Sequence, residues 1–112
     1  MLSRVTAEEL RTGGGRTGRF EGEGYGSGVS FFLVDVDPGQ GPPLHRHPYT
    51  ETWVVHEGEA VVTADGEEHR AAAGDVLVVG VGTHHKFVAT GDGPLRMTCI
   101  HAAPRMEQEN LE

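Results

Sequence analysis

The stretch that decides the fold and chemistry of this chain reads Gly39-Gln-Gly-Pro-Pro-Leu-His45-Arg-His47-Pro-Tyr-Thr-Glu51. Side chains of an extended chain alternate between two faces, so His45 and His47 project from the same face and Glu51 shares their parity. A further histidine, His85, follows a strand-turn-strand later. Three imidazole nitrogens and one carboxylate oxygen suit a divalent transition ion, whereas Ca and Mg prefer all-oxygen shells. The sequence therefore predicts a metal site with ligands His45, His47, Glu51 and His85, and with positions left open for a substrate or dioxygen.

The length of the chain predicts a single domain. It has 112 residues, of which 17 are glycine, and this is enough sequence for one hydrophobic core but not for two. We expect one domain over residues 1–112, with a core barrel at about 18–103, a flexible N-terminal segment and a polar C-terminal tail at 104–112 that is loose or briefly helical.

The charge and cysteine content exclude several classes of partner. A formal net charge of -8 disfavours nucleic acid and anionic membranes, which are themselves negative, and leaves a small molecule as the expected partner. No apolar run approaches the ~20 residues that span a bilayer. The single cysteine, Cys99, forms no internal disulfide, so the fold does not depend on an oxidising compartment. These features predict a cytoplasmic protein.

The remaining sequence is typical of an all-β protein. Thr6 and Glu9 have the spacing of a capping box, which predicts a short helical turn at 7–11. Glycine-marked turns then separate short segments rich in β-branched and aromatic residues. The expected strands are 29–36, 51–56, 59–64, 76–79, 85–90 and 95–101, with a weaker one at 19–23. This regular spacing without a helical period indicates a barrel or sandwich.

The glycine and ligand spacing resembles the cupin family. Gly39, His45, His47, Glu51 and Gly58 agree with every position of the first cupin motif. The second motif is matched less fully. Its glycines and histidine correspond to Gly74, Gly82 and His85, but Gly80 stands in place of a proline and Ala89 in place of an asparagine. Neither departure removes a metal ligand.

This resemblance implies a jelly-roll barrel with one divalent transition ion inside, such as Fe, Mn, Ni or Zn. Cupins include dioxygenases, isomerases, decarboxylases and sugar-binding sensors, so the resemblance leaves the reaction open. It also favours a homodimer, as does the apolar character of both faces of residues 29–34.

Several other residues are expected to line a pocket beside the ion. Trp53 shares the face of Glu51, and Phe87 shares that of His85, so these two would form an apolar wall. Tyr49 and Gln40 are candidates for substrate hydrogen bonds. Met97, Cys99 and His101 share the inward face of the last strand if the neighbouring arginine faces solvent.

Glu51 and His101 are the candidate catalytic residues, although His101 also fits a purely structural role. The other histidines are assigned to the surface. His84 points away from His85, and His84 as a ligand would break the motif spacing. His56 and His69 are interpreted as solvated.

Two functions fit these predictions. The first is a metal-dependent enzyme, dioxygenase-like or an isomerase, acting on a small enol, diketone or phenol. The alternative is a non-catalytic protein whose metal organises a pocket for a sugar or organic anion.

Overall fold

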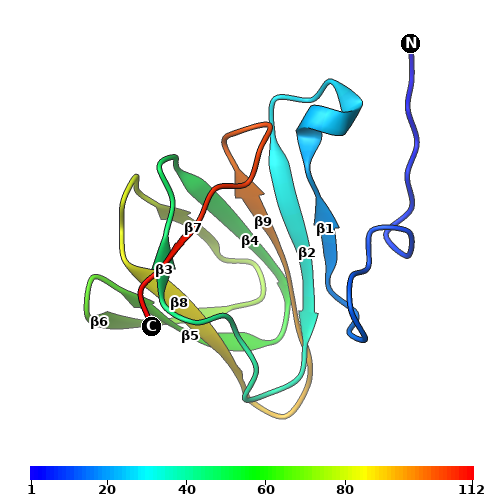
Figure 1. Ribbon diagram of the computed structural model, residues 1–112. Helices are drawn as coiled ribbons and strands as arrows, with labels where there is room; N and C mark the ends of the chain where they lie inside the picture. The colour runs from blue at the N-terminus through cyan, green and yellow to red at the C-terminus, as the bar shows by residue number, and fades with distance from the viewer.

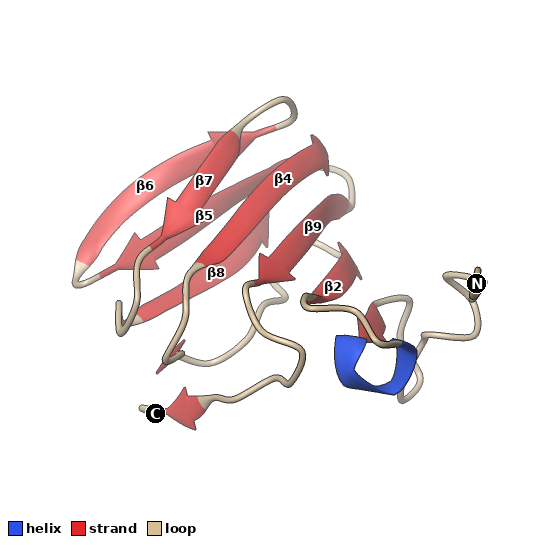
Figure 2. Cartoon of the chain, turned by 90° about the horizontal axis from the view of Figure 1, so that it is seen from above, coloured by secondary structure: helices blue, strands red, loops and turns tan.

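The computed structural model describes residues 1–112 and folds them into two antiparallel β-sheets (Figure 1). Seen from above, the two sheets form facing layers (Figure 2). One sheet has the strand order β1-β2-β9-β4-β7, and the other has the order β10-β3-β8-β5-β6. The strands are β1 (Gly18–Phe20), β2 (Ser30–Val36), β3 (His45–Arg46), β4 (Glu51–Glu57), β5 (Glu59–Ala64), β6 (Glu67–Ala72), β7 (Val76–Val79), β8 (His85–Thr90), β9 (Leu95–His101) and β10 (Glu109–Asn110). The prediction of an all-β jelly roll is confirmed.

The hydrophobic core lies between the two sheets and follows the alternation of the strands. In the pairing of β4 with β9, Trp53 lies opposite Cys99 and Val55 opposite Met97, and all four are buried. The same inward parity on β4 places Glu51 at the end of this row. The cluster of predicted ligands is therefore a continuation of the apolar core rather than a surface feature.

The N-terminal segment contains less helix than the capping box predicts. Residues 7–10 form a hydrogen-bonded turn, in which the Leu10 N–H lies 3.3 Å from the Thr6 carbonyl and 3.2 Å from that of Ala7. The expected cap is present, because the Glu9 N–H donates to the Thr6 hydroxyl at 3.2 Å. The only helical element is a 3-10 helix, η1 (Gly22–Tyr25), which the sequence did not predict.

The C-terminal segment also differs from expectation. Its polar composition predicts a loose or briefly helical tail, yet Glu109 and Asn110 form β10 and pair with Arg46 and His45 of β3. The last residues therefore run beside β3, the strand that carries His45, as the red segment in Figure 1 shows.

None of the chain's helices has the length and apolarity needed to cross a membrane.

Candidate metal centre

The two histidines at positions 45 and 85 are brought together by strand pairing. His45 of β3 lies directly opposite His85 of β8 in the antiparallel register. The segment before β3 approaches β8 closely, because the Gly39 N–H donates to the Ala89 carbonyl at 2.8 Å. Gly41 permits this approach, since a Cβ there would overlap the carbonyl of Phe87. Gly41, which is not one of the motif glycines, is thus required for the close packing of this segment on β8 beside the candidate metal centre.

The other two residues enter from neighbouring segments. Glu51 begins β4 and lies opposite His101 of β9. His47 follows β3, and its carbonyl accepts a hydrogen bond from the Gly82 N–H at 2.9 Å. This bond ties the loop carrying His47 to the turn before His85.

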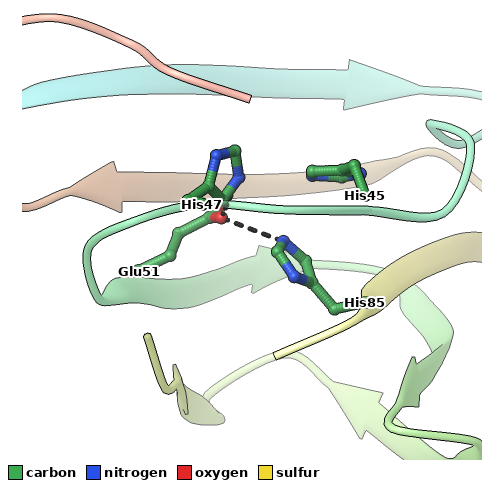
Figure 3. Close-up of side chains that lie close together, drawn as sticks. All are labelled: His45, His47, Glu51 and His85. Atoms are coloured by element: carbon green, nitrogen blue, oxygen red, sulfur yellow. Dashed lines mark ion pairs between the residues drawn. The ribbon is translucent and has the colours of Figure 1, made fainter. Parts of the chain in front are cut away.

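One potential ligand atom from each of the four residues converges on a common point (Figure 3). These atoms all lie within 4.8 Å of one another, and all four residues are buried. The Glu51 Oε1 lies 3.1 Å from the Nε2 of His47 and 3.2 Å from the Nε2 of His85. Two donors each ~2.1 Å from one ion, at right angles to each other, would be about 3 Å apart. These separations therefore fit a shared coordination sphere.

The hydrogen bonding of this cluster is incomplete without a further partner. The Nε2 atoms of His47 and His85 and the Oε1 of Glu51 are fully buried, and none has a hydrogen-bond partner. Leaving such atoms unpaired is costly, so each unpaired atom in a native fold calls for an explanation. A divalent ion would satisfy all three at once.

The opposite ring nitrogens are already committed to backbone carbonyls. The Nδ1 atoms of His45, His47 and His85 lie 2.7, 2.7 and 2.8 Å from the carbonyl oxygens of Pro43, Glu107 and Thr83, respectively. A carbonyl oxygen only accepts, so each Nδ1 carries the proton and each Nε2 presents a lone pair. This arrangement orients imidazoles for metal binding in known metal sites.

The electrostatics of the cluster keep its carboxylate ionised. Burial alone would raise the pKa of Glu51, but the imidazoles of His101, His47 and His85 hold that pKa well below its usual range. Burial lowers the pKa of His45 and so favours its neutral, metal-binding form. For His47, burial is outweighed by Glu51 and the Glu107 carbonyl, which together raise its pKa.

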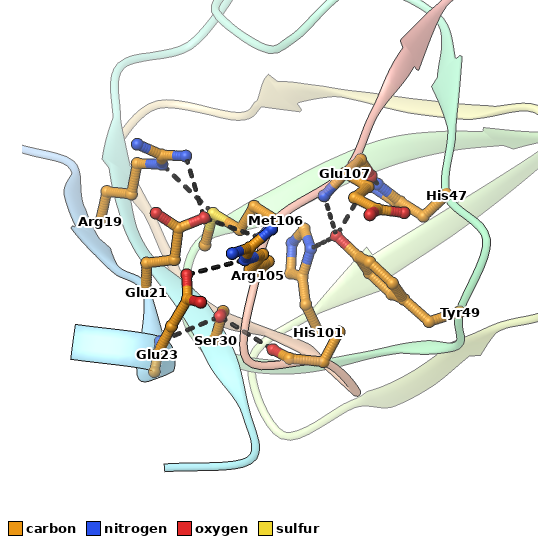
Figure 4. Close-up of polar contacts among 12 residues, drawn as sticks. Arg19, Glu21, Glu23, Ser30, His47, Tyr49, His101, Arg105, Met106 and Glu107 are labelled. Carbon is orange, nitrogen blue, oxygen red and sulfur yellow. Dashed lines mark hydrogen bonds and ion pairs between the residues drawn. The ribbon is translucent and has the colours of Figure 1, made fainter. Parts of the chain in front are cut away.

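His101 lies beside the four residues and is braced from behind by Tyr49 (Figure 4). Its Nδ1 is 2.6 Å from the Tyr49 hydroxyl, and its Nε2 lies 3.5 Å from Glu51 Oε2 without a hydrogen-bond partner. The same Oε2 accepts a hydrogen bond from the Trp53 Nε1–H at 2.6 Å. Glu51 therefore directs one oxygen to the cluster and the other to Trp53 and His101.

A cavity of about 650 Å³ opens next to the cluster. Its lining includes two of the four predicted ligands, the buried residues His45 and Glu51. One apolar wall is formed by Phe32, Val34 and Val36, successive inward residues of β2. The expected pocket residues that line it are Gln40, Trp53, Phe87, Cys99 and His101.

Two residues predicted for this lining lie elsewhere. Met97 is buried in the core opposite Val34 and Val55, farther along the barrel than Glu51. Tyr49 stacks on the His47 ring, with ring centroids 5.1 Å apart, and so supports the cluster from outside the cavity. Cys99 reaches the cavity, but burial raises the pKa of its thiol far above the usual value, which keeps it protonated.

Two parts of the cavity lining were not predicted from the sequence. One is the β2 wall, and the other is formed by the segments that contain Arg16 and Gln108. The alternation of Phe32, Val34 and Val36 was a signal that could have placed them inward. Arg16 and Gln108, which also line the cavity, carry no such signal because they lie in segments without periodicity. The exposed positions of His56, His69 and His84 agree with their predicted surface roles.

Comparison with known sequences identifies the family of this fold. The family model described as "Cupin domain" matches residues 32–101. The chain is 35% identical over 80 residues to polyketide synthase CurC of Streptomyces cyaneus, which is 70% of this chain and 51% of that protein. It is 29% identical over 82 residues to tetracenomycin polyketide synthase protein TcmJ of Streptomyces glaucescens, covering 70% of this chain and 55% of that protein. The chain thus spans about half the length of these curated relatives.

Solved structures agree with this match. A cupin 2 domain-containing protein from Halorhodospira halophila superposes with a TM-score of 0.75 at 24% identity, over 86% of this chain and 69% of that chain. Oxalate decarboxylase of Bacillus subtilis, studied for its Mn(II) centres, gives a TM-score of 0.77 at 26% identity over 91% of this chain and 29% of that one.

Proposed function

The chain belongs to the cupin family, and from this premise we propose that it is a metal-dependent enzyme acting on an oxygen-bearing small molecule. The observation that carries the proposal is the set of buried, unpartnered ligand atoms on His47, Glu51 and His85. His45 completes the set, and its Nδ1–H is bonded to Pro43 in the same way as those of the other two histidines are bonded to their carbonyls. In this proposal the four residues hold one divalent transition ion.

A bound ion would supply Lewis-acid polarisation of a substrate oxygen and, if redox-active, dioxygen chemistry. Four protein ligands leave positions of a six-coordinate ion free for such an oxygen. The protein's own part is to orient the substrate against that position. A dioxygenase-like reaction or an isomerisation of an enol, diketone or phenol fits this arrangement.

His101 is the residue proposed to bind a substrate oxygen directly. Its Nε2 is buried and unpartnered, and the residue lines the cavity beside Glu51. The Tyr49 hydroxyl on its Nδ1 is both a donor and an acceptor, so the Nε2 is able to offer either a proton or a lone pair. Together, His101 and Glu51 would hold or move a proton at the substrate oxygen nearest the ion.

The shape of the cavity favours a substrate much longer than a two-carbon acid. Glu51 and His101 align with the start of β2 at Ser30, and the apolar wall leads away from them to Val36. From Phe32 to Val36 the strand covers about 13 Å at roughly 3.3 Å per residue. We therefore propose a planar, largely apolar molecule with neighbouring oxygens at one end. The similarity to proteins named as polyketide synthase components supports this class.

The proposal can be tested by loading metal-free protein with Fe(II), Mn(II) or Zn(II) and supplying β-diketones, phenols and aromatic polyketides. We expect turnover of at least one of these compounds, measured by oxygen uptake or by product analysis. The Glu51→Gln variant should turn over none of them. Compounds that bind but return unchanged with every ion would favour the non-catalytic binding protein instead.

We also propose that the protein forms a homodimer through the outer face at β7. Val76, Val78 and Val81 are 63, 70 and 64% exposed, and β7 is an edge strand. Exposed apolar residues beside an open edge are typical of an interface.

In light scattering, the wild type should have twice the monomer mass and Val78→Asp the monomer mass. Val88→Asp, which alters an exposed valine of the other sheet, is the control and should remain dimeric. A monomeric wild type would contradict the proposal.

A further inference from the structure

The C-terminal residues 104–112, here termed the C-terminal strap, make contacts beyond those of a solvent-exposed tail. The strap begins against η1, where the Glu23 N–H donates to the Pro104 carbonyl at 2.8 Å. The Arg105 guanidinium lies 2.8 Å from the Glu23 carboxylate. The Met106 N–H donates to the Glu21 carboxylate at 2.9 Å. Figure 4 shows this part of the strap passing from these acidic residues toward His101 and His47.

The far end of the strap is held by the strand that carries His45. The Leu111 N–H donates to the Leu44 carbonyl at 2.8 Å, and the Leu44 N–H donates to the Glu112 carboxylate at 2.8 Å. Glu109 forms an ion pair with Arg46 at 2.8 Å. Both ends are thus attached to the body of the protein by backbone as well as side-chain bonds.

Between these attachments, the strap contacts a proposed metal ligand. The Glu107 carbonyl accepts the Nδ1–H of His47 at 2.7 Å. The Glu107 N–H donates to the Tyr49 hydroxyl at 3.1 Å, and that hydroxyl contacts His101. A single residue, Glu107, therefore contacts a proposed ligand histidine through its carbonyl and, through Tyr49, the residue proposed to bind substrate.

This brace has no local substitute. His45 and His85 donate to carbonyls two residues earlier in the chain, at Pro43 and Thr83, whereas His47 donates to a residue 60 positions away. If the strap lifts from β3, His47 loses its only Nδ1 acceptor, while the other two imidazoles keep theirs. Its ring is then free to rotate and to carry its proton on Nε2, the atom that faces the cluster.

We propose that the C-terminal strap positions His47 for metal binding, so that seating of the strap and uptake of the ion stabilise each other. This inference rests on the metal binding proposed above. Linkage requires the effect to be reciprocal: the factor by which the strap improves the affinity for the ion is the factor by which the ion favours the seated strap. The strap thus makes ion affinity depend on whether the C-terminal segment is docked.

The first test is a Zn(II) competition titration of three variants against the wild type. One variant ends at Ala103, and Leu111→Pro removes the N–H that bonds Leu44. The control lacks residues 2–5, a terminal segment whose Leu2 is 87% exposed and which lies on the opposite side of the molecule from β3 and β8 in Figure 1. Loss of an outer-sphere brace typically weakens metal affinity by about 10–100-fold. We expect a loss of this size on truncation, a smaller loss for Leu111→Pro, and none for the control.

The second test needs no metal. Nitrogen-15 NMR of the imidazoles should find the Nδ1–H tautomer for all three histidines in the metal-free full chain. In the truncated chain and in Leu111→Pro, only His47 should shift toward the Nε2–H tautomer. If the truncated chain does not fold, the Zn(II) titration and the NMR measurement are decided by the Leu111→Pro variant alone.

A third readout is hydrogen exchange at the Leu111 amide, which Zn(II) should slow by the same factor as the affinity change. Unchanged affinity and an unchanged His47 tautomer in Leu111→Pro would overturn the inference. If the full chain takes up no ion but its His47 tautomer responds to the strap, metal binding fails while the positioning of His47 stands.

Discussion

The imidazoles of His45 and His85 are oriented by their own neighbourhoods, whereas that of His47 is oriented from the other end of the chain. The first two donate to carbonyls two residues earlier, in the segments immediately before β3 and β8. The third depends on Glu107 in the C-terminal strap. The imidazole of a proposed ligand can therefore be oriented by a residue from a distant part of the sequence.

Removing a ligand should have the largest effect and should separate the two kinds of histidine. Both His85→Ala and His47→Ala remove a nitrogen from the proposed coordination sphere, so each should weaken Zn(II) binding by more than the ~100-fold typical of an outer-sphere change. Competition titration measures this loss. Wild-type affinity in either variant would remove that residue from the site.

The two variants should differ in the strap. His47→Ala leaves the Glu107 carbonyl without its donor, so the Glu107 and Leu111 amides should exchange faster in metal-free protein. His85 bonds to Thr83 and not to the strap, so His85→Ala should leave these exchange rates unchanged. Equal exchange in the two variants would remove the distinction between locally and remotely braced ligands.

The next effect concerns Glu51, which is braced by a side chain rather than by backbone. Trp53→Phe removes the 2.6 Å hydrogen bond to Glu51 Oε2 while keeping an aromatic ring in the core. A hydrogen bond to a charged group contributes about 1.5–3 kcal/mol, so the free energy of unfolding should fall by about 2 kcal/mol. Urea denaturation of metal-free protein measures it. Phe87→Leu, which alters the neighbouring ring without touching Glu51, should leave the pKa of Glu51 low, whereas Trp53→Phe should raise it.

The pH dependence should distinguish His47 from His45. The pKa of His47 is raised above its ordinary 6.5 and that of His45 is lowered below it. As the pH falls, His47 should therefore protonate first. Below the pKa of each ligand histidine, the affinity for Zn(II) should fall by about tenfold for each further pH unit. In metal-free protein, His47 contributes stability that is present below pH 6.5 and is lost as pH rises through its folded pKa. For His45 the sign is reversed. NMR titration follows both rings, and protonation of His45 before His47 would contradict this order.

The smallest effect is expected at the opposite terminus. Arg16 pairs with Asp35 at 3.1 Å and with Asp37 at 2.8 Å at the cavity mouth, where its side chain is 45% exposed. Exposed pairs contribute little, so Arg16→Ala should lower Tm by no more than about 4 °C. Zn(II) affinity should stay within about twofold of wild type, because no contact of Arg16 reaches a proposed ligand. A loss as large as that of the truncated strap would mean that both termini brace the site.

Much of this architecture could be predicted from the sequence. Strand parity placed His45, His47 and Glu51 on one face, and the glycine-marked turns returned His85 to them. The same reasoning put Trp53 and Phe87 beside the cluster. These predictions succeed because side-chain alternation and turn chemistry are local properties of the chain.

The strap could not be predicted for a physical reason. Its function depends on the Glu107 carbonyl, and every residue type presents the same carbonyl, so the letters of the sequence carry no signal. Its polar composition also indicated a loose tail, whereas pairing of Glu109 and Asn110 with β3 holds it in place. For Met97, parity predicts the inward position that the structure shows, but parity carries no information on how far along the barrel the residue lies.

We propose that His45, His47, Glu51 and His85 together hold one divalent ion. X-ray absorption spectroscopy of protein loaded with one equivalent of Zn(II) or Mn(II) tests it most directly. The predicted spectrum contains imidazole scattering from three histidines and a contribution from one carboxylate oxygen. That oxygen contribution should change in Glu51→Gln. A shell without imidazole scattering, or protein that retains no ion after desalting, would contradict the claim.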